Sequence, residues 1–280
     1  MKKRISIAVL LTCHNRKDET HKCLSQLFEN KSSNFILKVY LVDDNSTDGT
    51  SEMIENNFPS VNVIKGTGDL FWNRGMHLAW ETASIKDYDS YLWLNDDTYL
   101  KNNALESIYY AHIEKPNSIL VGTLLNDSIN NKSNNISYGG RMLNNRDDII
   151  VPNNYFQRCD IFNGNCVLVP RFVFQKIGNL DYYFRHSYGD FEYGLRAKKN
   201  NIESYIVSNF VGHCKTNVVD GNFNFLSRKY NLRQRINLLY SPLGKNPYEA
   251  FYISRKYNSF IYSFLVFLKL HYNVIFKLKD

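Results

Sequence analysis

Apolar runs alternate with stretches of helical periodicity along the first 125 residues of the chain. Five runs have the length and composition of buried strands, namely residues 5–12, 36–42, 61–66, 91–94 and 118–122. Helices are expected between them, over residues 16–30, 50–57, 74–84 and 101–114. In the last of these, Leu105, Ile108 and His112 recur at the i, i+3, i+7 spacing of one helical face. Near-continuous apolar strands separated by helices predict an α/β fold with a mostly parallel sheet covered on both faces.

The pattern becomes less regular after residue 125. Residues 126–155 are rich in Asn, Ser, Asp and Gly, which predicts a loop region or an irregular hairpin rather than a linker between domains. Residues 162–171, FNGNCVLVPR, predict a further strand, and a helix is expected from about Asp190.

Polar clusters follow three of the predicted strands. TCHN comes after the first strand, DDNSTDGT after the second and NDDT after the fourth. Because ligands gather at the carboxyl ends of parallel strands, we expect these clusters to converge on one rim of the sheet. Ser46, Thr47 and Asp48 are good helix caps, but the adjacent carboxylates of Asp43 and Asp44 exceed what a cap requires.

The NDDT cluster carries the sharpest chemical signal. Asp96 and Asp97 stand side by side at the end of an apolar strand, where two carboxylates repel each other unless a cation or a ligand hydroxyl lies between them. A divalent metal or a ribose satisfies that condition. Mg²⁺ or Mn²⁺ suits carboxylate ligands and typically takes one or two of them together with substrate phosphates.

Composition places these motifs in one large domain with an appendage. The chain has 280 residues, of which 44% are hydrophobic, and we expect a main domain over residues 1–220 and a basic, aromatic helical region over residues 221–280. The second region holds ten Lys and Arg and two acidic residues, which give it a net charge of +8. Because the net charge of the whole chain is +7, the first 220 residues have a net charge of −1. Five cysteines without a CxxC pair argue against a disulfide framework or a thiolate zinc site and suit a reducing compartment.

The C-terminal region has two interpretations. Its longest apolar stretch, residues 264–268, falls far short of the roughly 20 residues needed to cross a bilayer. A basic, aromatic helix suits the interface of an anionic membrane, and it equally suits a cationic subdomain packed on the core. At the other end, the short apolar run after residues 2–4 lacks a cleavage site, so a first strand and no signal peptide is expected there.

Together the motifs resemble family 2 of the nucleotide-sugar glycosyltransferases. The resemblance rests on the ordered set TCHN, VDDNSTDGT, WNRG, LNDDT, FNGNCVLVPR and YGDFEYGLR, and it spans roughly residues 5–215. It is closest in kind to the bacterial surface-polysaccharide type, similar to rhamnosyltransferases and galactosyltransferases. It implies the GT-A fold, a Rossmann-like, mostly parallel sheet with helices on both faces, and a hexosyltransferase activity.

The resemblance also implies the binding residues. For the donor nucleotide these are Thr12, His14, Asn15, Asp44, Asn73, Gly75 and Asp96, with Asp44 bonded to the base and Asp96 near the ribose. For the divalent metal, Mg²⁺ or Mn²⁺, Asp97 is implied as the ligand, since Asn95 stands where the DXD signature has its first Asp. His213, in VGHCK, is either a further metal ligand or a core residue.

Asp190, in YGDFEYGLR, lies where family members carry the catalytic base, and its structural alternative is a helix cap. Glu192 is the rival base, but residues i and i+2 of a helix face different ways, so only one of the two should point into the site. A single base with direct displacement inverts the anomeric centre. Arg196 would steady a nearby carboxylate or phosphate or lie on a solvated face, and Trp72 would stack on a sugar or fill the core.

The expected function is therefore inverting, metal-dependent transfer of a sugar from a UDP- or dTDP-sugar donor to a hydroxyl of a glycan acceptor. The acceptor is expected to be lipid-linked, in capsule or O-antigen synthesis, with the protein cytoplasmic and peripheral on the inner face of the cell membrane. The alternatives are a nucleotide-sugar-binding protein without turnover and a nucleic-acid-binding protein that uses the basic tail. An acidic rim repels a phosphate backbone, so no nucleic-acid partner is expected. A sugar-nucleotide pyrophosphorylase requires a Gly-rich phosphate-binding loop after the first strand. The corresponding segment here, TCHNRKDE, has no Gly, which argues against that class of enzyme.

Overall fold

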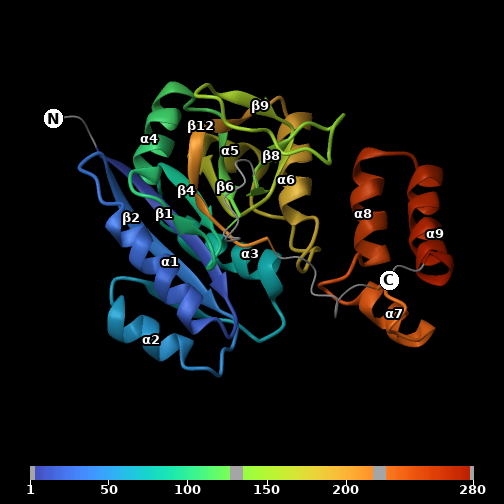
Figure 1. Ribbon diagram of the computed structural model, residues 1–280. Helices are drawn as coiled ribbons and strands as arrows, with labels where there is room; N and C mark the ends of the chain where they lie inside the picture. Colours follow the sequence, from blue (N-terminus) through green and yellow to red (C-terminus); the bar gives the residue numbers. More distant parts are fainter. Residues whose placement is uncertain (1–3, 127–134, 217–224, 278–280) are drawn as a thin grey trace.

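The computed structural model describes residues 4–126, 135–216 and 225–277, which form a central sheet with helices on both faces and a helical C-terminal region (Figure 1). The strands are β1 Ile5–Cys13, β2 Phe35–Asp43, β3 Asn62–Lys65, β4 Ser90–Leu94, β5 Tyr99–Leu100, β6 Ile119–Leu125, β7 Ile136–Tyr138, β8 Gly140–Arg141, β9 Gln157–Cys159, β10 Ile161–Phe162, β11 Cys166–Pro170 and β12 Ser204–His213. The helices are α1 Lys17–Glu29, α2 Thr50–Asn57, α3 Phe71–Ser84, α4 Ala104–Glu114, α5 Arg171–Ile177, α6 Gly189–Lys199, α7 Leu232–Tyr240, α8 Pro247–Tyr257 and α9 Phe260–Phe276. Every strand and helix expected in the first 125 residues is present.

The sheet has the strand order β3-β2-β1-β4-β11-β6-β12-β5. β1 pairs in parallel with β2 and β4, β2 with β3, and β6 with β12, whereas β11 runs antiparallel to both of its neighbours. The expectation of a mostly parallel sheet is therefore confirmed. Because β1 and β2 are in register, Cys13 lies opposite Asp43, and the polar residues that follow the two strands emerge at the same edge.

A separate apolar layer lies on each face of the sheet. On one face α1, α2 and α4 contribute buried side chains such as Leu24, Ile54 and Ile108. On the other face α3, α5 and α6 pack around Trp80, which is fully buried. Strands that are buried on both sides need apolar residues at successive positions, and this explains why β1 and β4 read as continuous apolar runs.

Two expected elements differ in detail from the structure. α3 begins at Phe71 rather than at residue 74, which brings residues 71–73 into its first turn. The strand expected over residues 162–171 is divided into β10 and β11 by residues 163–165. The irregular region of residues 126–155 contains the short strands β7 and β8, and its residues 127–134 lie outside the described part of the chain.

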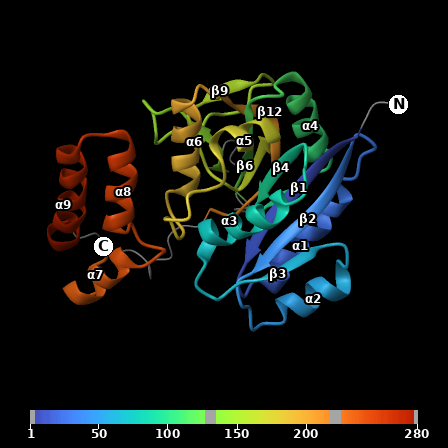
Figure 2. The ribbon, with the colours of Figure 1, turned by 180° about the vertical axis from the view of Figure 1, so that it is seen from behind.

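The C-terminal region is helical, as its composition predicts. α8 and α9 form a hairpin beside α6 (Figure 2), and α8 is fixed to the core by ion pairs of Arg185 with Glu249 at 3.0 Å and of Lys256 with Asp181 at 2.9 Å. The expected boundary between residues 220 and 221 lies outside the described residues. Among the residues that are described, no helix is both long enough and apolar enough to span a membrane.

Candidate active site

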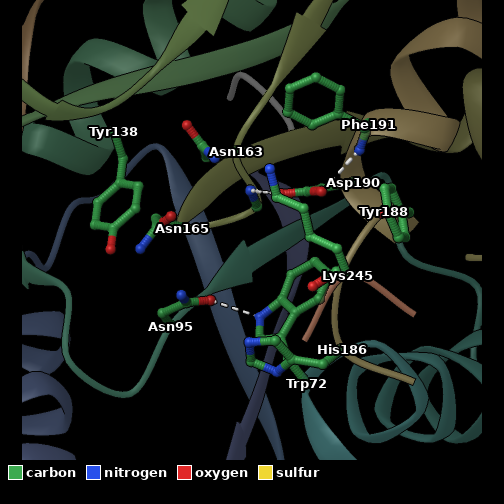
Figure 3. Close-up of a pocket in the computed structure, with 12 residues that line it drawn as sticks. Trp72, Asn95, Tyr138, Asn163, Asn165, His186, Tyr188, Asp190, Phe191 and Lys245 are labelled. Atoms are coloured by element: carbon green, nitrogen blue, oxygen red, sulfur yellow. Dashed lines mark hydrogen bonds between the residues drawn. The ribbon is translucent and has the colours of Figure 1, made fainter. Parts of the chain in front are cut away.

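Two cavities adjoin each other at the carboxyl ends of the strands. The strand-end cavity, of about 360 Å³, lies over β1, β2 and β4, and the Asp190 cavity, of about 400 Å³, lies beside the start of α6 (Figure 3). Trp72, Asn95 and His186 line both cavities. The two spaces are therefore halves of one site that share a wall.

The strand-end cavity brings the predicted clusters together. Its lining includes Thr12 at the end of β1, His14 just after β1, Asp44 just after β2, and Asp96 and Asp97 after β4. The convergence of TCHN, DDNSTDGT and NDDT on one rim is thus confirmed, and it follows from the parallel pairing of β1 with both β2 and β4.

Arg16 bridges the two adjacent carboxylates. Its guanidinium lies 3.3 Å from Asp96 Oδ1 and 2.9 Å from Asp97 Oδ2. Burial raises the pKa of Asp96 to about 7 even though Arg16 opposes the shift. The sequence predicts either a cation or a ligand hydroxyl between Asp96 and Asp97, and nothing in it singles out Arg16 as a cation at this place.

The residues at this corner fit a divalent metal that arrives with a phosphate. Asp96 Oδ2 is buried and has no hydrogen-bond partner within the described part of the chain, and an uncompensated carboxylate oxygen of this kind suits a cation. The described residues contain no group of three His, Cys, Asp or Glu side chains arranged for a metal, but Mg²⁺ and Mn²⁺ need only one or two carboxylates when phosphates complete the set.

His213 is not gathered with these carboxylates. It ends β12, where it pairs with Tyr99 of β5, and its side chain is exposed. It lines neither of the two cavities. Cys214, the next residue, is the one whose side chain reaches Asp97, with its Sγ 3.4 Å from Asp97 Oδ1.

The two adjacent carboxylates at the end of β2, Asp43 and Asp44, have different environments. Asp44 accepts hydrogen bonds from the backbone N–H groups of Gly68 at 2.7 Å and Leu70 at 2.9 Å, so it holds the turn that leads into α3 while it lines the strand-end cavity. Asp43 accepts from the N–H of Ser46 at 3.0 Å and from the hydroxyl of Ser51. Asp43 therefore organises the loop before α2 rather than the cavity wall.

His14 and Asn15 also separate. His14 lines the strand-end cavity and its Nδ1 lies 2.7 Å from the backbone oxygen of Asp44. Asn15 faces the neighbouring loop, where its Oδ1 accepts from the N–H of Thr47 at 2.7 Å and its N–H donates to Ser46. Asn15 is thus absent from the lining of both described cavities.

Asn73 and Gly75 lie behind the wall of the site. Asn73 is fully buried and donates to the backbone oxygens of Asp181 and Phe184, both at 2.8 Å. Gly75 packs on Thr12 so closely that a Cβ there would lie 2.2 Å from Thr12 Oγ1. Asn73 therefore holds the loop that precedes α6, and Gly75 lets α3 approach β1.

Asp190 is the second residue of α6 and lines the Asp190 cavity. Its carboxylate accepts hydrogen bonds from the N–H of Gly164 at 3.0 Å and from the N–H of Phe191 at 2.8 Å (Figure 3). Burial raises its pKa above the ordinary value of 3.8, and the two N–H donors act in the opposite direction. A fixed carboxylate of raised pKa at a cavity wall is suited to accept a proton.

Glu192 points elsewhere. Its side chain is fully buried, forms ion pairs with Arg196 at 3.1 Å and with Lys256 of α8, and accepts from the hydroxyl of Tyr257 at 2.9 Å. Arg196 also donates to the backbone oxygen of Ile177 at 2.6 Å. Both residues hold α6 to its neighbours, so neither reaches the cavities.

Trp72 forms the wall that the two cavities share. Its indole N–H donates to Asn95 Oδ1 at 2.7 Å, and its ring meets Trp93 edge-on with the centroids 6.3 Å apart. A Cβ at Gly164 would lie 2.3 Å from the indole, so only glycine leaves room for it. Asn95, which departs from the DXD signature, therefore positions this indole.

Three lining residues carried no signal in the sequence. His186 borders both cavities, and burial lowers the pKa of its imidazole and favours the neutral form. Leu243 lines the strand-end cavity and Lys245 lines the Asp190 cavity, both from the loop between α7 and α8. The C-terminal region thus contributes directly to the site.

Comparison with known proteins gives the family context. Residues 8–178 match the family described as "Glycosyl transferase family 2". No curated protein sequence matches the chain significantly.

Solved structures share the fold over almost the whole chain. TarS 1-349 of S. aureus in complex with UDP-GlcNAc is 14% identical with a TM-score of 0.60, over 96% of this chain and 73% of that one. The mannosyltransferase PcManGT of Pyrobaculum calidifontis, in complex with GDP-Man and Mn²⁺, is 14% identical with a TM-score of 0.55, over 98% and 71%. GalNAc-T7 with UDP, GalNAc and Mn²⁺ is 13% identical with a TM-score of 0.62, over 97% and 55%. The expected GT-A architecture is confirmed.

Proposed function

The chain belongs to glycosyl transferase family 2, and from this premise we propose that it transfers a hexose from a UDP- or dTDP-sugar to a hydroxyl of a glycan acceptor, with inversion at the anomeric carbon. The observation that carries the proposal is the pair of adjoining cavities, one lined by three carboxylates and an arginine and the other by a single carboxylate of raised pKa. That division suits a donor in the strand-end cavity and an acceptor in the Asp190 cavity.

The donor half is supported by its polar groups. Thr12, His14 and Asp44 offer hydrogen-bonding groups for a nucleoside, and Asp96 lies beside them for the ribose. The solved relatives hold UDP, UDP-GlcNAc or GDP-Man, which supports a nucleoside diphosphate as the carrier of the sugar.

Asp96 and Asp97 would hold a divalent metal, Mg²⁺ or Mn²⁺, together with the diphosphate of the donor. Bound there, the metal would neutralise negative charge on the departing diphosphate. Two of the solved relatives contain Mn²⁺, which supports this cofactor. Arg16 is the chain's own cation at the same place, and its guanidinium can turn from the carboxylates to a phosphate once another cation pairs with them.

Asp190 is the proposed general base. Its carboxylate takes the proton of the acceptor hydroxyl while the acceptor oxygen forms a bond to the anomeric carbon. The bond from that carbon to the diphosphate oxygen breaks, and the nucleoside diphosphate leaves with the electron pair. One displacement from the face opposite the leaving group inverts the anomeric centre. The N–H groups of Gly164 and Phe191 fix the carboxylate during this step.

The acceptor is proposed to be a lipid-linked glycan of surface-polysaccharide synthesis, handled at the inner face of the cell membrane. Two observations support this proposal. α9 exposes a row of large apolar side chains, including Phe260, Ile261 and Leu265, and residues 221–280 carry a net charge of +8. Apolar side chains beside cationic ones suit the interface of an anionic membrane.

The first test is calorimetric binding of UDP, dTDP, GDP and CDP to the purified chain, each with and without Mn²⁺. We expect a pyrimidine diphosphate to bind only with the metal, and Asp97→Ala to abolish that binding. The matching sugar nucleotides then enter a transfer assay in which NMR reports the anomeric configuration of the product. Absence of binding by every nucleotide in both conditions would refute the transferase site, and a retained configuration would refute the single displacement.

A further inference from the structure

A third cavity, of about 580 Å³, lies between α6 and the hairpin of α8 and α9. We call it the hairpin cavity. Most of its lining is apolar or aromatic, and all three helices contribute to it, with Leu195 from α6, Ile253 and Tyr257 from α8, and Val266 and Leu270 from α9. A concave, largely apolar site of this size is suited to a hydrocarbon ligand.

The hairpin cavity adjoins the Asp190 cavity. Tyr188 and Phe191 line both of them, and these two residues stand on either side of the proposed base in the first turn of α6. A ligand in the hairpin cavity therefore lies next to the place where the acceptor hydroxyl is expected. This continuity distinguishes the cavity from an unrelated apolar hollow.

Cationic groups surround the hairpin cavity. Arg146, Lys198 and Lys199 are exposed and belong to its lining, and Lys245 lies in the adjoining Asp190 cavity. Lys198 is already paired with Asp160 at 2.7 Å, whereas the Nζ of Lys199 lies 5.8 Å from the centre of the Tyr257 ring. An apolar cavity with cations at its rim is complementary to a molecule that joins a hydrocarbon chain to a phosphate.

We propose that the hairpin cavity binds the hydrocarbon chain of a long-chain lipid phosphate or diphosphate, the carrier of the acceptor glycan. This inference rests on the proposed function, because it assigns the neighbouring carboxylate to the acceptor hydroxyl. The hydrocarbon packs among the side chains of α6, α8 and α9, the phosphate pairs with Arg146 and Lys199, and the glycan extends past Tyr188 and Phe191 toward Asp190. The exposed apolar face of α9 gives the hydrocarbon a route from a membrane to the hairpin cavity.

The test is binding of farnesyl diphosphate to the full chain, measured by calorimetry without any sugar nucleotide. Farnesol and inorganic pyrophosphate, each alone, report the contributions of the hydrocarbon and the charge. We expect saturable binding of farnesyl diphosphate, weaker binding of farnesol and little binding of pyrophosphate.

Two matched pairs of variants locate the site. Leu270→Trp fills the cavity from α9 and is expected to weaken binding roughly tenfold or more, since it builds a clash against the ligand, whereas Leu268→Trp on the exposed face of the same helix should leave binding unchanged. Lys199→Ala should weaken the binding of farnesyl diphosphate but not the binding of farnesol. Lys176→Ala, an exposed lysine that also lies near an aromatic ring, is its control.

The outcomes separate this inference from the proposed function. The lipid site would be overturned if farnesyl diphosphate does not bind, if its binding does not saturate, or if its binding falls equally in Leu270→Trp and Leu268→Trp. This conclusion would hold whether or not the nucleoside diphosphates bind. A concentration-dependent dimer, seen by light scattering and disrupted by Leu270→Trp, would assign the cavity to a second copy of the chain and overturn it as well. Normal lipid binding with no nucleotide binding would instead refute the transferase site alone.

Discussion

Glu192 lies two residues after Asp190 in α6, and the helix turns the two carboxylates in different directions. Asp190 lines a cavity and is held by the N–H groups of Gly164 and Phe191. Glu192 is fully buried, where it pairs with Arg196 and Lys256. One carboxylate is thus available to a substrate, and the other joins α6 to α8.

Asp190→Asn is expected to lower the rate of sugar transfer by about 10²–10⁴-fold, because a carboxamide cannot accept the proton of the acceptor hydroxyl. The strand-end cavity does not include Asp190, so binding of the nucleoside diphosphate should be unchanged. Steady-state transfer rates and calorimetry on the same preparations give the two quantities. Transfer at the wild-type rate would rule out Asp190 as the base.

The raised pKa of Asp190 predicts two pH effects. Transfer should lose rate as the pH falls through the raised pKa, so the acid limb of kcat/KM lies above the ordinary value of 3.8 and disappears in Asp190→Asn. For stability, a raised folded pKa favours the folded state at low pH, and this contribution is lost as the pH rises through that pKa.

Urea unfolding measures the second effect. Asp190→Asn should gain free energy of unfolding relative to the wild type as the pH rises from about 4 through the raised pKa, and the difference should be constant below that window. The altered hydrogen bonds in Asp190→Asn change the free energy of unfolding by an amount that does not depend on pH, so they do not affect how the difference between variant and wild type changes with pH. A difference that is independent of pH would mean that burial does not perturb the carboxyl group.

Glu192→Gln is expected to lower the free energy of unfolding without a direct effect on the cavities. The substitution removes the buried anion that Arg196 and Lys256 share, although Lys256 keeps its ion pair with Asp181. Removal of one partner from a buried ion pair costs about 3–5 kcal/mol. We expect roughly the lower limit of that range, because the two cationic side chains remain 20% and 30% exposed. Glu203→Gln, which removes the exposed partner of Arg158, is the control and should change stability little. Equal losses in the two variants would mean that Glu192 does not anchor α8.

Much of the fold could be predicted because burial leaves a direct trace in the sequence. β1 and β4 are buried on both faces and appear as continuous apolar runs. Their parallel pairing then requires that the polar residues at their carboxyl ends meet at one edge, which places Thr12 with Asp96 and Asp97. The antiparallel direction of β11 has no such trace, since it depends on the path of the loops that precede it.

The individual roles of site residues could be predicted less well, because side-chain direction depends on packing between distant segments. Asn73 and Asn15 belong to the motifs, yet their amides bond to backbone groups outside the cavities. His186 and Lys245 reach the site only because the loops before α6 and α8 fold over it. Neither loop has a motif that distinguishes these residues from solvent-exposed ones.

Gly164→Ala is expected to lower transfer by displacing Trp72. Its Cβ would lie 2.3 Å from the indole, so the ring must move from its hydrogen bond with Asn95. A shift of about 1 Å in a positioning group can cost as much as 10²-fold in rate, and we expect a loss of about tenfold to that limit. Transfer kinetics measure it, with circular dichroism as the check on folding.

A double-mutant cycle assigns that loss to the indole. In a Trp72→Phe background the ring is smaller and the bond to Asn95 is already absent, so Gly164→Ala should have a much smaller additional effect. Losses that simply add would show that Gly164 acts through its N–H bond to Asp190 instead.

Arg16→Ala is expected to make the protein more responsive to Mn²⁺. In the wild type the guanidinium pairs with Asp96 and Asp97 at 3.3 and 2.9 Å, so a metal at these carboxylates must displace it. Without Arg16 the two carboxylates lose their counter-ion and the melting temperature should fall. Added Mn²⁺ should then raise the melting temperature by more than in the wild type, because a ligand stabilises the folded state in proportion to the logarithm of its concentration relative to its Kd.

Thermal denaturation with MnCl₂, and again after EDTA, measures both shifts in melting temperature. Lys17→Ala is the control for a lost neighbouring charge. A shift no larger than that of the wild type would mean that Arg16 and the metal do not compete for Asp96 and Asp97.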